Sequence, residues 1–158
     1  MAGTVLYVVD MQYGFPASEN IIDETIREIR LARRRKDHIV FVELGPLSNG
    51  MTHGQLLETA GVKRTSRIKK RVADGSEEFI AEIKKIGLKH KRVRVCGVNR
   101  DACVMNTVSG LMNRLPENIG IELACAATAD YAHTKWNPTG YTEMVIARFA
   151  KEGRIKLK

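Results

Sequence analysis

Short apolar runs alternate along the chain with segments whose apolar residues recur at helical spacing. The strand-like runs cover residues 4–9, 38–44, 66–71, 91–98 and 121–127, and residues 154–157 are expected to form an edge strand. No hairpin signal joins successive runs, and predicted helices separate them. The pattern therefore predicts an α/β fold with right-handed crossovers and a doubly wound, Rossmann-like, mostly parallel sheet of five to six strands, with helices on both faces.

Turn and cap residues set the expected ends of the last helix. Asn137 and Pro138 are typical of a helix start, and Gly153 is typical of a helix end. Tyr141 and Phe149 are spaced to lie on one buried face of this helix.

The expected strand order brings two chemically active residues together. In a doubly wound sheet of order 3-2-1-4-5-6, the strand order reverses between the first and the fourth strand. Asp10 ends the first strand, and Cys103 follows the fourth. The topology therefore predicts that Asp10 and Cys103 lie on opposite lips of one crevice.

Cys103 has two interpretations. A thiol in the first turn of a helix meets unpaired N–H groups and the positive end of the helix dipole, which favour the nucleophilic thiolate. Cysteine is also among the commonest core residues, so the thiol alone does not indicate chemistry. The location at a strand end of an open α/β sheet, where such folds place their active sites, favours a chemical role.

A thiol beside an acid also needs a cation. Asp10 could take the thiol proton and return it to a leaving amine, but two adjacent anions raise each other's pKa. A lysine next to both groups would keep the carboxylate charged. Lys70, near the end of the third strand, is the best-placed candidate, and Lys69 is its competitor.

Length and charge limit the class of protein. The 158 residues are expected to form one domain, residues 1–158, and the 26 basic against 18 acidic residues give a net charge of +8. The basic runs, at residues 33–36, 63–71 and 89–94, are interpreted mainly as solvated surface. Because aromatic residues do not interleave them, a nucleic-acid partner is not expected.

The cysteines and the apolar runs indicate the compartment. Three cysteines are an odd number, so a disulfide framework is not expected and a reducing cytoplasm fits best. No run has the length of a membrane span, and the first residues lack the pattern of a secretory signal. The chain is therefore expected to be cytoplasmic, with no membrane partner.

Three motifs resemble the isochorismatase-like superfamily of cysteine hydrolases, which includes nicotinamidases and N-carbamoyl amide hydrolases. They are LYVVDMQYGF at residues 6–15, RIKKRVADGS at residues 67–76 and CGVNRDACV at residues 96–104. The last motif, which resembles the nucleophile turn of the family, is the most specific. The motifs span almost the whole chain.

The resemblance implies an active site and a reaction. It implies a catalytic triad of Asp10, Lys70 and Cys103, and a cis peptide bond between Val98 and Asn99. The backbone N–H groups of Asn99 and Cys103 would form an oxyanion hole. Cys103 would attack the carbonyl carbon of a small amide or carbamoyl compound and form a thioester, while Asp10 shuttles protons.

Three further residues are expected to contact the substrate. Gln12 and Phe15 lie beside Asp10 at the predicted cleft, where they could also merely anchor the loop. Arg100 stands where the family often has threonine, and a cation at the mouth of the cleft would favour an anionic substrate.

The sequence departs from the metal-binding members of the family. Nicotinamidases typically bind a metal through an Asp-x-His motif after the second strand, where this chain has residues 43–46, ELGP, with only His53 nearby. We therefore expect no metal and no cofactor, which counts against nicotinamide as the substrate. The segment between the second strand and Lys70 is also shorter than in most members.

Alternatives to a hydrolase remain open. One is a non-catalytic protein of the same fold that binds a small anion or a protein partner. A weaker one is an RNA-associated basic module. Because members of the family commonly associate, the resemblance also implies a homo-oligomer.

Overall fold

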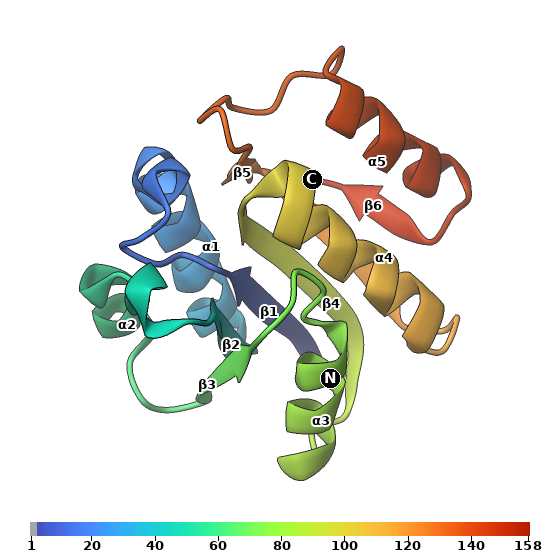
Figure 1. Cartoon of the computed structure of the whole chain (residues 1–158). Helices are drawn as coiled ribbons and strands as arrows, with labels where there is room; N and C mark the ends of the chain where they lie inside the picture. Colours follow the sequence, from blue (N-terminus) through green and yellow to red (C-terminus); the bar gives the residue numbers. More distant parts are fainter. Residues whose placement is uncertain (1–2) are drawn as a thin grey trace.

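Six parallel strands form the centre of the molecule in a computed structural model that describes residues 3–158. The strand order is β3-β2-β1-β4-β5-β6, which confirms the predicted sheet (Figure 1). The strands are β1 (Gly3–Val9), β2 (His38–Leu44), β3 (Thr65–Lys70), β4 (His90–Val98), β5 (Gly120–Ala129) and β6 (Ile155–Leu157).

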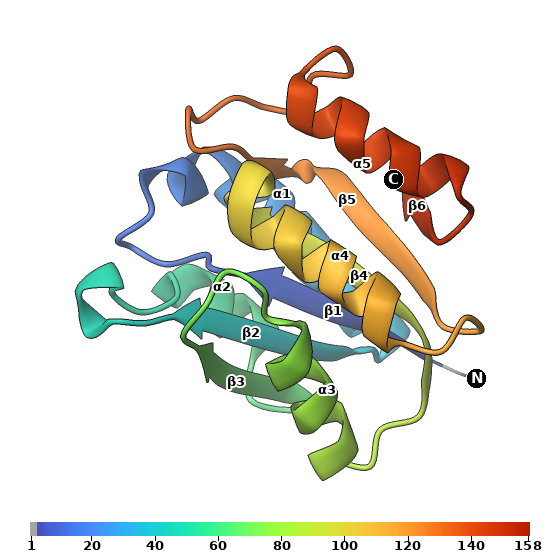
Figure 2. The same ribbon diagram turned by 45° about the vertical axis from the view of Figure 1, so that its right-hand side comes forward.

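Five α-helices cover both faces of the sheet, as predicted. Helices α1 (Ile22–Arg35) and α2 (Gly54–Ala60) pack on one face. Helices α3 (Ser76–Lys85), α4 (Met105–Arg114) and α5 (Tyr141–Lys151) pack on the other. Figure 2 shows α4 lying across the middle of the sheet, above β1 and β4. Among residues 3–158, none of the helices combines the length and the apolar character needed to cross a bilayer.

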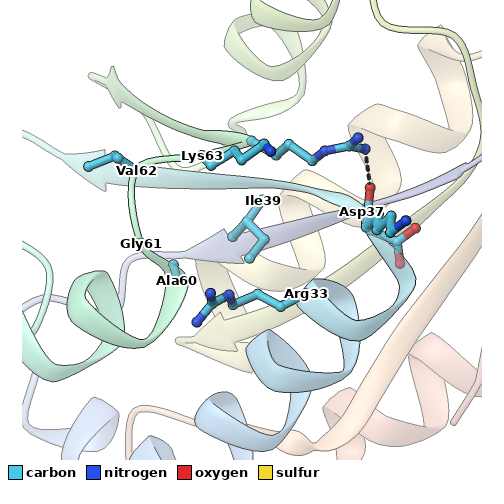
Figure 3. A pocket seen from close by; sticks show the side chains of 9 residues that line it. Arg33, Asp37, Ile39, Ala60, Gly61, Val62 and Lys63 are labelled. Atoms are coloured by element: carbon cyan, nitrogen blue, oxygen red, sulfur yellow. Dashed lines mark hydrogen bonds between the residues drawn. The ribbon is translucent and has the colours of Figure 1, made fainter.

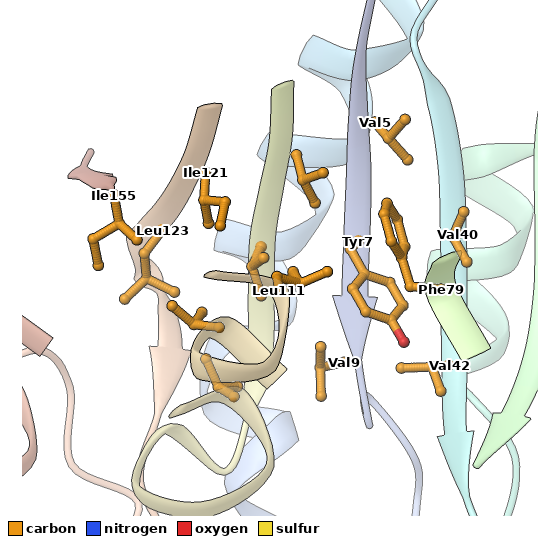
Figure 4. Packing of buried hydrophobic residues seen from close by; sticks show 14 of the residues in the cluster. Val5, Tyr7, Val9, Val40, Val42, Phe79, Leu111, Ile121, Leu123 and Ile155 are labelled. Carbon is orange, nitrogen blue, oxygen red and sulfur yellow. The ribbon is translucent and has the colours of Figure 1, made fainter. Parts of the chain in front are cut away.

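Strand alternation divides the core into two layers. On β1, Val5, Tyr7 and Val9 point to the face covered by α3, α4 and α5 (Figure 4). Leu6 and Val8 point to the opposite face, where α1 and α2 lie. Because successive side chains of a strand alternate, a strand buried on both faces must be apolar at nearly every position. This requirement explains the near-continuous apolar runs in the sequence.

The start of the last helix differs from the prediction. Helix α5 begins at Tyr141 rather than at Asn137, and Tyr141 is exposed rather than buried. The Asn137 side chain accepts a hydrogen bond from the backbone N–H of Thr139 at 3.2 Å, so the chain makes a local turn before the helix starts. The inward face of α5 instead carries Glu143 and Ile146.

The carboxyl edge of the sheet gathers the residues that the sequence singled out. Asp10 directly follows β1, Lys70 is the last residue of β3, and Asn99 directly follows β4. Parallel strands end at the same edge, so residues far apart in the sequence become neighbours there.

Candidate active site

Asp10 is held in an unusual backbone conformation at the end of β1. Its φ angle is 52°, in the left-handed region, which aspartate adopts more readily than most residues. Its N–H donates a hydrogen bond of 3.0 Å to the Val42 carbonyl, so the next strand fixes this turn. The carboxyl group is buried and faces the end of β3.

Lys70, rather than Lys69, contacts Asp10. The Lys70 Nζ lies 3.1 Å from Asp10 Oδ2, and both side chains are buried. The same Nζ donates a hydrogen bond of 2.6 Å to the Ala73 carbonyl. Lys69 is exposed because neighbouring residues of a strand point to opposite sides. The lysine beside the acid is therefore the one that the sequence analysis favoured.

Cys103 enters the site from a single turn of π-helix, Arg100–Val104, that precedes α4. The peptide bond between Val98 and Asn99 is cis, as the resemblance implied. Gly97, just before it, has a φ of 123° and passes so close to the Val9 carbonyl that a Cβ would not fit. Cys103 is 6% exposed, whereas Asp10 and Lys70 are each 1% exposed.

Burial sets the protonation of the thiol. Desolvation and the nearby Asp10 charge raise the pKa of Cys103 to about 12, and Lys70 only partly offsets them. The thiolate expected at a helix start is therefore not the form that this site favours before substrate binds. Burial also raises the pKa of Asp10, although Lys70 acts in the opposite direction. A carboxylate with a raised pKa is a stronger base, suited to take the thiol proton.

Buried hydrogen bonds between Tyr7, Gly75 and Thr107 lie next to the Lys70 side chain. The sequence did not predict them. The Tyr7 hydroxyl donates to the Gly75 carbonyl at 2.8 Å, and the Gly75 N–H donates to Thr107 Oγ1 at 3.0 Å. A Cβ at Gly75 would collide with the Tyr7 hydroxyl and crowd the Lys70 side chain. The apolar period placed Tyr7 inward, but no local pattern signals which backbone group its hydroxyl would meet.

Gln12 anchors a loop, and the prediction that it contacts substrate is not supported by its contacts. Its Nε2 donates to the carbonyls of Leu44 (3.1 Å) and Gly50 (2.8 Å). Its Oε1 accepts the Leu44 N–H at 2.7 Å. These bonds occupy both ends of the buried amide, so it offers a substrate no free polar group.

Arg100 does not lie at the mouth of a cleft, in contrast to the prediction. Its side chain is completely buried and its Nη2 lies 2.6 Å from Glu143 Oε1 on α5. The guanidinium also donates to the carbonyls of Thr128, Thr134 and Lys135. A buried guanidinium needs a carboxylate and several acceptors, so its charge is neutralised inside the protein. Arg100 therefore joins the nucleophile turn (residues 99–104) to the segment after β5.

Trp136 and Phe15 are two aromatic residues that pack against the core clusters on opposite faces of the sheet. Trp136 is partly buried, packs against the cluster that contains Cys103, and lies under the Arg100 guanidinium at 5.5 Å. Phe15 is partly buried and packs against the cluster on the α1 and α2 face. Its predicted contact with substrate therefore stays a proposal.

Glu43 and His53, which lie where the sequence was compared with a metal-binding motif, make contacts within the chain. Glu43 Oε1 accepts hydrogen bonds from Thr52 and Arg67, and His53 Nε2 lies 2.6 Å from Ser18 Oγ. These contacts use one carboxylate oxygen of Glu43 and one ring nitrogen of His53. Within residues 3–158, no three His, Cys, Asp or Glu side chains gather closely enough to hold a metal ion.

The sheet order defines the doubly wound, parallel α/β fold that the sequence predicted, and solved structures share this fold. The nicotinamidase SaPncA from Staphylococcus aureus superposes with a TM-score of 0.78 at 22% identity, over 100% of this chain and 98% of that one. The MAR1 ribonuclease from Caenorhabditis elegans gives a TM-score of 0.78 at 20% identity, over 99% of this chain and 77% of that one.

A third similar structure is YcaC from Escherichia coli, described as an octameric hydrolase of unknown specificity. Its TM-score is 0.73 at 15% identity, over 98% of this chain and 74% of that chain. Comparisons with protein-family models and with curated protein sequences find no match. At these identities the likeness establishes the fold, and the chemistry has to be argued from the residues of this chain.

Replacing Lys70 and Lys69 by alanine in separate variants tests which of the two lysines the proposed reaction needs. Lys70→Ala removes the cation that contacts buried Asp10, so we expect kcat to fall by about 10²-fold or more. Lys69→Ala, one residue away and exposed, is the matched control and should leave kcat unchanged. Steady-state kinetics on one substrate would measure both. An equal loss in the two variants would contradict the assignment of Lys70.

Proposed function

We propose that this protein is a metal-independent cysteine hydrolase that cleaves a C–N bond of a small amide or carbamoyl compound. The observation that carries the proposal is the convergence of a thiol, a carboxyl group and an ammonium group from three separate strand ends. Asp10 and Lys70 are in contact at 3.1 Å, and both lie close enough to Cys103 to shift the pKa of its thiol in opposite directions. Core packing alone does not require a buried ion pair beside a thiol, because such a pair is costly to desolvate.

In the first half of the proposed reaction, the Cys103 sulfur attacks the carbonyl carbon as its proton moves to Asp10. The carbonyl oxygen gains a negative charge, which the backbone N–H groups of Asn99 and Cys103 would stabilise, by about 3 kcal/mol for each donor. Asp10 then gives the proton to the leaving nitrogen, the C–N bond breaks, and ammonia or an amine departs. The acyl group remains on sulfur as a thioester.

Water completes the reaction. Asp10, again a carboxylate, takes a proton from the water that attacks the thioester carbon. The C–S bond then breaks, and Asp10 returns a proton to the sulfur, which regenerates the thiol and releases the acid. Lys70 keeps its contact with Asp10 throughout, which favours the charged carboxylate at each proton transfer.

A panel of small primary amides and carbamoyl compounds, with ammonia release as the readout, tests the proposed function. The account predicts turnover on at least one compound without added metal and in the presence of a chelator. Turnover that depends on added metal would contradict the metal-independent mechanism. The absence of turnover on every compound, with the protein folded, would favour the alternative below.

The alternative is a non-catalytic protein of the same fold. The observation that favours it is the burial of the site: Asp10 and Lys70 are inaccessible and Cys103 is 6% exposed. Substrate entry would then require the surrounding loops to move. The buried, neutralised state of Arg100 removes it as the anion-binding group of such a protein.

The raised pKa of Asp10 predicts the acid limb of the pH profile. Asp10 must be ionised to accept the thiol proton, so activity is lost as the pH falls through its pKa. Because burial raises that pKa, kcat/KM should begin to fall at a pH above the usual carboxyl value of 3.8. Far-UV circular dichroism at each pH would separate this loss from unfolding. A profile that stays flat into the ordinary carboxyl range would contradict the role of Asp10.

We also propose that the protein forms a homo-oligomer and that it works in the reducing cytoplasm. The description of YcaC as octameric supports a homo-oligomer for this chain, and so do exposed apolar side chains such as Leu47 and Tyr13. In the described part of the chain all three cysteines are free thiols, which fits a cytoplasmic protein.

A further inference from the structure

Basic segments that are far apart in the sequence meet at the amino edge of the sheet, opposite Cys103. One cavity there, of about 380 Å³, is lined by Arg33 and Lys36 at the end of α1 and by Lys63 and Arg64 before β3. Figure 3 shows Arg33 and Lys63 on either side of Ile39 in this cavity.

A second cavity adjoins the first. It has a volume of about 790 Å³ and shares Lys36, Asp37 and Arg64 with its neighbour. Arg35, Lys89 and Arg92 add further positive charge to its lining. All three basic runs, interpreted from the sequence mainly as solvated surface, therefore contribute to one pair of hollows, the amino-edge cavities.

Most of this charge has no carboxylate partner. Within residues 3–158, Arg35, Lys36, Lys63 and Lys89 form no ion pair, whereas Arg92 pairs with Glu122 at 3.2 Å. Surface cations left together in a concave site repel one another, and an anion that neutralises several of them binds favourably.

The arginines and the one carboxylate of the cavities are partly engaged within the chain. Arg33 donates to the Thr59 carbonyl at 2.9 Å and Arg64 to the Lys36 carbonyl at 2.6 Å, so both side chains are held in place while their charge stays unpaired. The single carboxylate in the lining, Asp37, is buried and accepts the Thr4 N–H at 3.1 Å. One carboxylate cannot neutralise all the lysine and arginine side chains that line the two cavities.

The carbonyl groups at the C-terminus of α1 are not the partners of the unpaired cations in the cavities. The carbonyls of a helix C-terminus attract cations. Here the Ala32 and Arg33 carbonyls accept the backbone N–H groups of Asp37 and Lys36, and the Lys36 carbonyl is taken by Arg64. In the described residues, the side chains of Lys36, Lys63 and Lys89 make no hydrogen bond and no ion pair.

We propose that the amino-edge cavities bind a small anion that carries two or more linked phosphate groups. Arginine forks and lysine ammonium groups are the usual ligands of phosphate oxygens. The cavity volumes match those of small-molecule sites. Their lining includes no Phe, Tyr or Trp on which a nucleobase would stack, so the chemistry favours the phosphate chain over a nucleic-acid strand.

The site is separate from the proposed hydrolase site, so the two proposals fail independently. Isothermal titration calorimetry of the whole protein with inorganic tripolyphosphate, at low salt, is the test. The double variant Lys36→Gln/Lys89→Gln removes two exposed cations of the cavities, and we expect at least about tenfold weaker binding. The double variant Lys151→Gln/Lys156→Gln makes the same change of net charge on α5 and β6 and should bind as the wild type does.

Three results would overturn this proposal. The first is no binding of tripolyphosphate to the wild type, and the second is an equal loss of affinity in both double variants, which would mean attraction by net charge alone. The third is tighter binding of a short single-stranded RNA than of tripolyphosphate through the same two lysines, which would reassign the site to nucleic acid. A rise in Tm with tripolyphosphate, present in the wild type and lost in Lys36→Gln/Lys89→Gln, would support the proposal without calorimetry.

Discussion

Replacing Cys103 with alanine is expected to lower kcat by about 10⁴-fold or more while the protein stays folded. The sulfur is the atom that would form the thioester, and removing the nucleophile of such a site typically abolishes nearly all turnover. The change deletes one small, almost buried group, so we expect a loss of about 1 kcal/mol in the free energy of unfolding. Ammonia release and urea unfolding would measure the two effects.

Cys125 provides the matched control for this substitution. It is a second, partly buried thiol, on β5. Cys125→Ala should therefore change stability by a similar amount and leave kcat unchanged. Turnover in Cys103→Ala at the rate of the wild type would show that the nucleophile has been assigned wrongly.

Arg100→Ala is expected to have the largest effect on stability, about 3 to 5 kcal/mol in the free energy of unfolding. The change leaves Glu143 buried without its counter-charge and leaves three carbonyl acceptors without a donor. Arg100→Lys should recover only part of the loss, because one ammonium group cannot reproduce the fork of donors. Urea unfolding at neutral pH measures these differences.

Arg114→Ala is the control for a surface arginine. Arg114 also forms two ion pairs, with Asp74 and Glu77, but its side chain is 38% exposed, so its loss should cost about 1 kcal/mol or less. The double variant Arg100→Ala/Glu143→Gln should lose less stability than the sum of its single variants, since it leaves no unpaired charge. If Arg100→Ala were no more destabilising than Arg114→Ala, the buried pair would not hold the nucleophile turn to α5.

The strand order and the carboxyl-end residues are encoded by local sequence patterns, whereas the side-chain pairs between distant segments are not. The order of the strands and the residues at their carboxyl ends follow from apolar runs that are buried on both faces, so Asp10 and Cys103 could be placed together before the structure was known. The sequence favoured Lys70 but left Lys69 open, because β3 is an edge strand with weak alternation. Only its register with β2, where Lys70 pairs with Leu44, decides which lysine points inward.

Long-range pairs explain what the sequence could not predict. The partner of Arg100 is Glu143, on a helix whose start was predicted too early, so a buried arginine looked like an exposed one. The bonds of Gln12 join the loop after β1 to the end of β2, and the shape of that loop has no sequence signature. The amino-edge cavities likewise form only when three distant segments meet.

The central claim is that Cys103 is the nucleophile, and its modification by iodoacetamide tests this most directly. Activity would be followed alongside peptide mass spectrometry that reports the modified fraction of Cys103 and of Cys125. The account predicts that activity falls in proportion to the alkylation of Cys103 and is independent of Cys125. Full activity in protein whose Cys103 is completely alkylated, or a loss of activity that follows the alkylation of Cys125 alone, would contradict it.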